Sequence, residues 1–245
     1  MMHPTFTRRL PLAGAPNTRD LGGYPCPGGV TRWGQFLRSA TTFTMQPKDI
    51  ETLLAYGVSN AIDLRSEQER VVHPSMLESA EGFTCHHISM LDQMNSSHFE
   101  GDLPGSMAGL YISLLDNNAA GFAAIFSVFA GATGGMLFHC TAGKDRTGVT
   151  AMLLLKLAGV EDADVIADYA VTDIYMREAV VHQIGSLRRN PNAPPMPDYV
   201  FRSLPESMER ALQHLAKTYG TAENYLLQAG VTAKEIAAVK AKLVQ

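Results

Sequence analysis

Residues 139–148 read HCTAGKDRTG and bring a cysteine, a lysine, an aspartate and an arginine into ten positions. The apolar run GGMLF stands before this segment and VTAMLLLKLAG follows it, which predicts a loop between a strand and a helix. At such a junction the free backbone N–H groups and the helix dipole favour an anion. The segment therefore predicts an anion-binding loop that starts with a cysteine.

Spacing excludes two familiar loops of this general kind. A nucleotide-binding P-loop requires a glycine and a serine or threonine at the positions where this chain has Phe138 and Asp145. Rhodanese-type sulfurtransferases carry a reactive cysteine on a similar loop, but their loop is usually one residue shorter and too small for phosphate. Five residues separate Cys140 from Arg146, a spacing that fits a cysteine attacking a bound phosphate.

The neighbours of Cys140 predict how the reaction would be shared among them. A helix N-terminus, a fixed guanidinium and a ring of backbone N–H groups favour the thiolate form of a cysteine. The N–H groups from Thr141 onward would hold three phosphoryl oxygens while Arg146 binds two of them bidentately, so that in-line attack gives a phosphocysteine. The hydroxyl of Thr147 would stabilise the departing thiolate in the second step. His139 would orient the loop from behind.

The chain before the loop is expected to alternate strands and helices. Turns rich in glycine and proline separate two or three short strands within residues 17–40. A helix that begins near Pro47 leads to a buried strand over 58–66, and a second extended run covers 82–90. Two helical patterns over 106–131 then precede the strand that carries the loop.

This order predicts an α/β fold: a central, mostly parallel sheet flanked by helices, with a helical C-terminal extension over about 198–245. The apolar helix after the loop is followed by one or two more helices over 162–189 and by a proline-rich break. The Ser-, Asn- and Gly-rich composition that begins at residue 91 predicts a lid-like insertion over about 91–120. We interpret residues 1–245 as a single domain.

The charge balance excludes a general attraction to nucleic acid or anionic lipid. The 245 residues include 20 Lys+Arg and 24 Asp+Glu, a formal net charge of −4, so any anion site must be local. The N-terminus lacks an apolar core of signal-peptide length, and no apolar stretch is long enough to span a membrane. We expect no integral membrane segment.

The cysteines are spaced neither as a disulfide framework nor as a metal site. Cys26, Cys85 and Cys140 lie far apart, which fits a reducing compartment and hence a cytoplasmic protein. Although His86 and His87 follow Cys85, adjacent residues of a strand point to opposite faces and do not converge on one ion. We expect neither a metal nor a cofactor.

Segments from both halves of the chain carry a family resemblance. HCTAGKDRTG resembles the signature of the cysteine-based protein tyrosine phosphatase superfamily. Together with NTRDLGGY at 17–24 and AIDLRSEQE at 61–69, the Lys-Asp pair before Arg146 is similar to the bacterial tyrosine phosphatase family of broad, dual or triple specificity. DYAVTDIYM at 168–176 and YGTAENYLLQAGVT at 219–232 are similar to later segments of that family, so the resemblance spans nearly the whole chain.

The resemblance implies a phosphate monoester hydrolase that acts on phosphotyrosine, with phosphoserine, phosphothreonine or phosphoinositides as further substrates. Cys140 would be the nucleophile and Arg146 the phosphate clamp. The remaining loop residues would form the substrate-binding cradle: Thr141, Ala142, Gly143 and Lys144. The partner would be a phosphorylated protein, a peptide or a phosphoinositide. The alternative from another class is a non-catalytic phosphate-binding module, a pseudophosphatase.

Lys144 has two interpretations. A basic residue inside the loop resembles lipid-directed phosphatases, in which it meets a second phosphate on an inositol ring. Equally, the lysine would raise the potential of the loop for any phosphate. The sequence leaves both open.

The general acid that protonates the leaving group is left open among three aspartates. Asp92 follows the extended run CHHISM, where many superfamily members carry their acid. Asp145 is its rival because this branch of the family has an aspartate in the loop, although between two basic residues it is a poor donor unless burial offsets their charge. Asp63 is a third candidate, or it ties Arg65 or Arg19 into the site.

Overall fold

The computed structural model describes residues 7–90, 105–189 and 196–244. Within them, five strands form one sheet in the order β1-β4-β7-β5-β6. β4, β7, β5 and β6 run parallel to their neighbours, and only β1 is antiparallel, to β4. The strands are β1 (Arg19–Asp20), β4 (Phe36–Ser39), β5 (Val58–Asp63), β6 (Thr84–His87) and β7 (Gly135–His139). The predicted mostly parallel sheet is confirmed.

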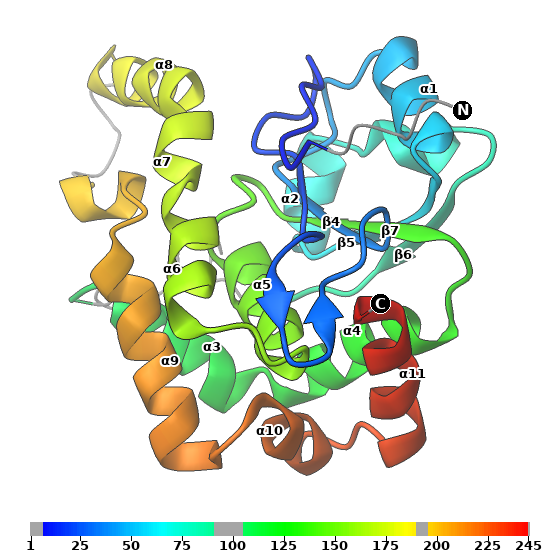
Figure 1. Ribbon diagram of the computed structural model, residues 1–245. Helices are drawn as coiled ribbons and strands as arrows, with labels where there is room; N and C mark the ends of the chain where they lie inside the picture. The colour runs from blue at the N-terminus through cyan, green and yellow to red at the C-terminus, as the bar shows by residue number, and fades with distance from the viewer. Residues whose placement is uncertain (1–6, 91–104, 190–195, 245) are drawn as a thin grey trace.

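A separate hairpin of β2 (Pro25–Cys26) and β3 (Gly29–Val30) follows β1. Helices cover both faces of the sheet (Figure 1). They are α1 (Pro47–Ala55), α2 (Glu67–Val72), η1 (Met76–Ser79), α3 (Met107–Asn117), α4 (Ala119–Gly131), α5 (Arg146–Leu157), α6 (Asp162–Ala170), α7 (Thr172–Tyr175), α8 (Arg177–Arg189), η2 (Asp198–Phe201), α9 (Pro205–Tyr219), α10 (Ala222–Gln228) and α11 (Ala233–Leu243).

The central strand β7 is buried on both faces. Met136 and Phe138 belong to the larger hydrophobic core, with α3, α4 and α5, whereas Leu137 belongs to a second core beneath α1. Alternate residues of a strand point to opposite faces, which explains this division. A parallel strand that is covered on both faces has a continuous apolar sequence, and GGMLF is a sequence of this kind.

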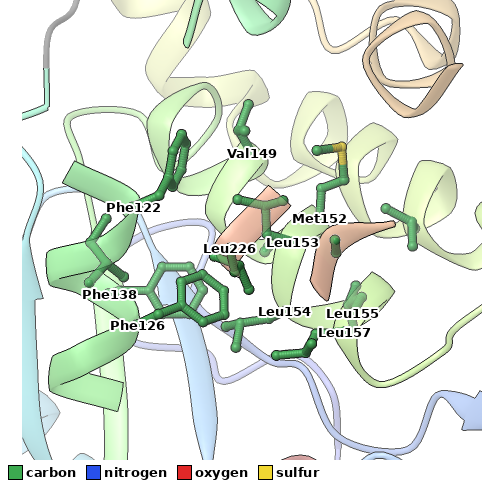
Figure 2. Packing of buried hydrophobic residues seen from close by; sticks show 14 of the residues in the cluster. Phe122, Phe126, Phe138, Val149, Met152, Leu153, Leu154, Leu155, Leu157 and Leu226 are labelled. Carbon is green, nitrogen blue, oxygen red and sulfur yellow. The ribbon is translucent and has the colours of Figure 1, made fainter. Parts of the chain in front are cut away.

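Helix α5 is the most deeply buried helix of the larger core. Every residue of α5 is buried except Lys156, as expected for a helix that is apolar on all sides. Phe122 and Phe126 of α4 and Leu226 of α10 pack around it (Figure 2). The 140–145 loop therefore joins two elements that are fixed in the core.

The C-terminal helices complete this core, as predicted for residues 198–245. α9 packs on α3 and α6, α10 on α5, and α11 on α4. In Figure 1 these three helices lie at the lower left, the bottom and the lower right of the molecule. Among the described residues no single helix is long and apolar enough to cross a membrane. α3 and α4 meet the length and composition only as a pair, and they are bent by 75° at their junction.

The prediction of a lid-like insertion over 91–120 is wrong for its second half. Residues 91–104 lie outside the described residues. From Met107 onward the chain is α3, which begins where the Ser106 side chain accepts a hydrogen bond from the Gly109 N–H. Leu110, Tyr111 and four other residues of α3 are buried. The polar composition that suggested a lid ends at the cap, and the apolar residues behind it belong to the core.

Candidate active site

The 140–145 loop begins where three parallel strands end together. Ser39 of β4 and Asp63 of β5 both pair with His139, the last residue of β7. Ligand sites of open α/β sheets lie at this carboxyl edge. A cavity of about 300 Å³ opens there. The loop lines one side with Cys140, Thr141, Ala142, Lys144, Asp145 and the adjoining Arg146, and residues of α7, α8 and the 196–203 segment line the other.

Gly143 makes the tight course of the loop possible. Its φ is +64°, in the left-handed region that side chains rarely adopt. A Cβ added there would lie 2.2 Å from the carbonyl oxygen of Ser39. Only glycine fits, because the loop passes directly against the end of β4.

The carbonyl groups of the loop are tied from behind. The Asn17 amide donates to the carbonyl oxygens of Ala142 at 3.0 Å and Gly143 at 3.1 Å. Arg38 Nη2 donates to the same Gly143 oxygen at 2.8 Å. In a trans peptide the N–H points opposite to the C=O, so the N–H groups of Gly143 and Lys144 are directed away from these donors. In the described part of the chain, no N–H of residues 141–145 donates a hydrogen bond.

A buried carboxylate anchors these donors. Asp168 accepts a hydrogen bond from Arg19 Nε at 2.9 Å and one from Arg38 Nη1 at 2.5 Å. Burial alone would raise the pKa of Asp168, but the charges of the two arginines lower it to about 2. Arg19 also donates to the Asn17 carbonyl oxygen at 3.0 Å. Two arginines on one aspartate leave a net positive charge behind the loop, which favours an anion in front of it.

Arg146 is held by a carboxylate on a neighbouring helix. Glu69 of α2 pairs bidentately with it, Oε2 to Nη1 at 2.8 Å and Oε1 to Nη2 at 2.9 Å, and also accepts a hydrogen bond from the Thr141 hydroxyl. Burial alone would raise the pKa of Glu69, but the hydrogen bonds and charge of Arg146 lower it to about 2. Arg146 Nη1 also donates to the Leu64 carbonyl oxygen at 3.4 Å, so these contacts fix the orientation of the guanidinium at the edge of the cavity.

Asp145 is oriented by a buried tyrosine. The Tyr111 hydroxyl of α3 donates to Asp145 Oδ1 at 2.7 Å and lies 2.6 Å from the Tyr169 hydroxyl. Burial and the charge of Asp145 raise the pKa of Tyr111 well above its ordinary value, so the phenol keeps its proton. Asp145 Oδ2 accepts no hydrogen bond from the described residues, and Asp145 lines the cavity.

The side chain of Lys144 extends toward residues 200–202, which come from the C-terminal part of the chain. Its ammonium donates to the carbonyl oxygens of Val200 at 2.6 Å and Arg202 at 3.3 Å, and lies 3.4 Å from Asp145 Oδ1. Only 6% of the lysine is exposed. The lysine therefore lines the cavity with its charge already engaged.

A sequence model of the tyrosine phosphatase family matches residues 10–245, nearly the whole chain. This protein belongs to the tyrosine phosphatase family. The phosphatase is 33% identical over 220 residues to a tyrosine-protein phosphatase of Nostoc commune, covering 86% of this chain and 74% of the relative. A Cupriavidus necator protein with a provisional name of the same kind is 29% identical, covering 87% and 81% of the two chains. The triple specificity protein phosphatase PtpB of Mycobacterium tuberculosis is 29% identical over 108 residues, 40% of this chain and 39% of that protein.

The resemblance inferred from the sequence is thereby confirmed, and the protein is a phosphatase. Of the predicted site residues, the structure brings six to the lining of one cavity: Cys140, Thr141, Ala142, Lys144, Asp145 and Arg146. Gly143 lies between them but is not part of the lining. Asp92 lies outside the described residues. Thr147 is buried at the start of α5, and its hydroxyl makes no hydrogen bond to any described residue. It would be available to the sulfur.

Asp63 does not line the cavity of the phosphatase. It is buried beside it, where it pairs with Arg65 at 2.6 Å from Nη2 and lies 3.9 Å from His139 Nε2. Of the two arginines that the sequence offered as partners of Asp63, the structure pairs it with Arg65. Arg19 pairs with Asp168 instead. Because its carboxylate pairs with a guanidinium outside the cavity lining, the geometry favours the tying role of Asp63 over that of the general acid.

Sequence reasoning missed four residues that hold the site: Asn17, Arg38, Glu69 and Asp168. Glu69 had a readable signal, because Ser66 and Glu69 form a capping box at the start of α2. That spacing places Glu69 in the first turn of a helix directly after β5. Asn17 and Asp168 stand in two of the segments that carry the family resemblance, at 17–24 and 168–176. Nothing local indicates, however, that Asp168 pairs with residues 130 to 149 positions away.

Proposed function

We propose that the protein hydrolyses phosphotyrosine and other phosphate monoesters through a phosphocysteine intermediate. In the first step Cys140 Sγ attacks phosphorus, an S–P bond forms, and the bond from phosphorus to the leaving oxygen breaks. In the second, water attacks the phosphorus and the thiolate departs, with the Thr147 hydroxyl as its hydrogen-bond donor. One observation carries this proposal. The backbone N–H groups of residues 141–145 donate no hydrogen bond to the described residues, and they follow a cysteine that lines the cavity.

The loop and Arg146 would stabilise the charge that develops on the phosphoryl oxygens. Donors that already point into the site need no rearrangement during the reaction. Asn17 and Arg38 would keep the loop amides in place, and Glu69 would keep the guanidinium in place. A cysteine next to these phosphate-binding groups supports catalysis rather than binding alone, because the proposed nucleophile and the groups that would stabilise the phosphoryl oxygens belong to the same loop.

We propose Asp145 as the general acid of the first step and the general base of the second. Its Oδ1 is occupied by Tyr111, which leaves Oδ2 for the leaving oxygen and later for the attacking water. Asp92 is the competing candidate. The acid's variant should lose the basic limb of the pH profile, with least effect on substrates that have good leaving groups.

We propose phosphoserine, phosphothreonine and phosphoinositides as further substrates of the same site. The support comes from the Mycobacterium tuberculosis relative, whose name gives triple specificity. Residues 1–245 would act as one phosphatase domain, because α9 to α11 complete the core around α5. A thiolate nucleophile needs reducing surroundings, such as the cytoplasm, and the three cysteines of the chain are free.

The test compares wild type with Cys140→Ser, Asp145→Asn and Asp92→Asn on phosphotyrosine, phosphoserine and phosphoinositide panels across pH. We expect Cys140→Ser to bind a phosphotyrosine peptide but release no phosphate, and Asp145→Asn to lose the basic limb. Release by Cys140→Ser would refute the mechanism. Loss of the limb in Asp92→Asn alone would move the acid there. Binding without release by wild type would mean a pseudophosphatase.

A further inference from the structure

The ammonium of Lys144 is bound to a segment that is distant in sequence. Its three N–H groups face the Val200 and Arg202 carbonyl oxygens and Asp145 Oδ1. Because the lysine is nearly fully buried, these contacts are shielded from water and salt. A charge engaged in this way is not free to meet a second phosphate on a substrate.

The segment that Lys144 holds, residues 200–203, forms a wall of the cavity. Val200, Phe201 and Ser203 line the cavity opposite the 140–145 loop, together with Met176 and Val180. Four of these five side chains are apolar. The wall therefore offers an apolar face at the place where the group attached to the phosphate would lie.

A second anchor fixes the same wall to α7. Asp173 pairs with Arg202 Nε at 2.7 Å and accepts a hydrogen bond from the Ser203 N–H. In Figure 1, η2 lies beside the column of α6, α7 and α8. Lys144 and Asp173 thus hold the wall from two sides, one anchored in the loop and the other in α7.

We infer that Lys144 is a positioning residue that holds the 200–203 wall at the distance that suits an aromatic phosphate ester. This inference rests on the proposed function. An aryl ring attached to the phosphate is rigid and reaches the wall, where it gains packing against Val200 and Phe201. A phosphoserine side chain is too short to make this contact. Lys144 thereby contributes to selectivity for aryl over alkyl phosphates without touching either substrate.

The test uses Lys144→Met, with Lys156→Met as the matched control. Lys156 lies on α5, the helix that follows the loop, and also donates to a carbonyl oxygen, that of Val160, but lies outside the cavity lining. The substrates are a phosphotyrosine peptide, the same peptide with phosphoserine, and a soluble inositol bisphosphate. We expect Lys144→Met to raise KM for phosphotyrosine roughly tenfold, the equivalent of one charge-assisted hydrogen bond, with a smaller change in kcat. KM for phosphoserine should stay nearly unchanged.

Asp173→Ala removes the second anchor of the wall, the contacts of Asp173 with Arg202 and Ser203. If Lys144 acts through the wall, Asp173→Ala should lower the aryl-to-alkyl ratio in the same direction, and the double variant should lose less than the product of the two effects. This variant keeps the inference testable even if Lys144→Met fails to fold.

Two results would overturn the inference. A loss confined to inositol bisphosphate would mean that Lys144 binds substrate directly, and an equal loss on all three substrates would mean a general electrostatic role. A wild-type protein that releases phosphate from none of them would instead refute the proposed function. The two failures are therefore distinguishable.

Discussion

Asp168→Asn should destabilise the protein severely, although Asp168 does not line the cavity. The substitution removes the one negative charge between the buried guanidinium groups of Arg19 and Arg38. It also turns an amide N–H₂ toward donors. Breaking a buried ion pair by removing one partner costs about 3–5 kcal/mol of stability. Activity should fall as well, because Arg38 loses the partner that aims it at the Gly143 carbonyl oxygen.

The pKa of Asp168 gives a second way to calculate how much this carboxylate contributes to the free energy of unfolding. Lowering this pKa from 3.8 to about 2 corresponds to about 2 kcal/mol of stability. Because the folded-state pKa is depressed, this stability is present above about pH 4 and is lost as the pH falls toward about 2. The wild type should lose stability over that window, and Asp168→Asn should lack this component.

Urea denaturation monitored by circular dichroism at several pH values measures both effects. The matched control is Asp162→Asn on the same helix, whose carboxylate is 60% exposed and pairs with Lys156. That exposed pair should contribute less than about 1 kcal/mol. Two results would contradict this account of the buried network. One is a free energy of unfolding of Asp168→Asn within about 1 kcal/mol of the wild type at pH 7. The other is a variant whose stability falls between about pH 4 and about pH 2 as much as that of the wild type.

Two further substitutions probe the loop and its clamp. Glu69→Gln should lower kcat/KM about 100-fold in steady-state assays because it releases Arg146, whereas Glu67→Gln on the same helix should leave kcat/KM unchanged. An equal effect of both would assign the loss to helix α2 in general. Gly143→Ala should lower thermal stability and abolish phosphate release, since its Cβ meets a carbonyl oxygen 2.2 Å away, while Gly131→Ala meets nothing within 4 Å. A fully active Gly143→Ala would contradict the loop geometry.

The sequence was sufficient to predict that Cys140 and Arg146 lie together at one site, because they belong to one continuous segment. A strand, a loop of fixed length and a helix N-terminus place Cys140 and Arg146 relative to each other by local geometry alone. The same reasoning predicted the parallel sheet, since apolar strands alternate with capped helices. Both predictions depend only on neighbours in the chain.

The supporting residues could not be predicted, because tertiary packing brings them together. Arg19 and Asp168 are separated by 149 positions, and Lys144 meets Val200 across 56. Composition was also misleading for the lid-like insertion, whose predicted bounds of 91–120 ran past the polar stretch into the core helix at 107–117. That helix supplies Tyr111, the residue that orients Asp145.

The most direct test of the central claim is to trap the intermediate. Wild type and Cys140→Ser would be mixed with a phosphotyrosine peptide, quenched after a few milliseconds and digested for mass spectrometry. We predict a phosphoryl group on Cys140 in the wild type and none on the serine variant. Phosphate released with no phosphorylated Cys140 at any quench time, or a phosphoryl group on another residue, would contradict the phosphocysteine mechanism.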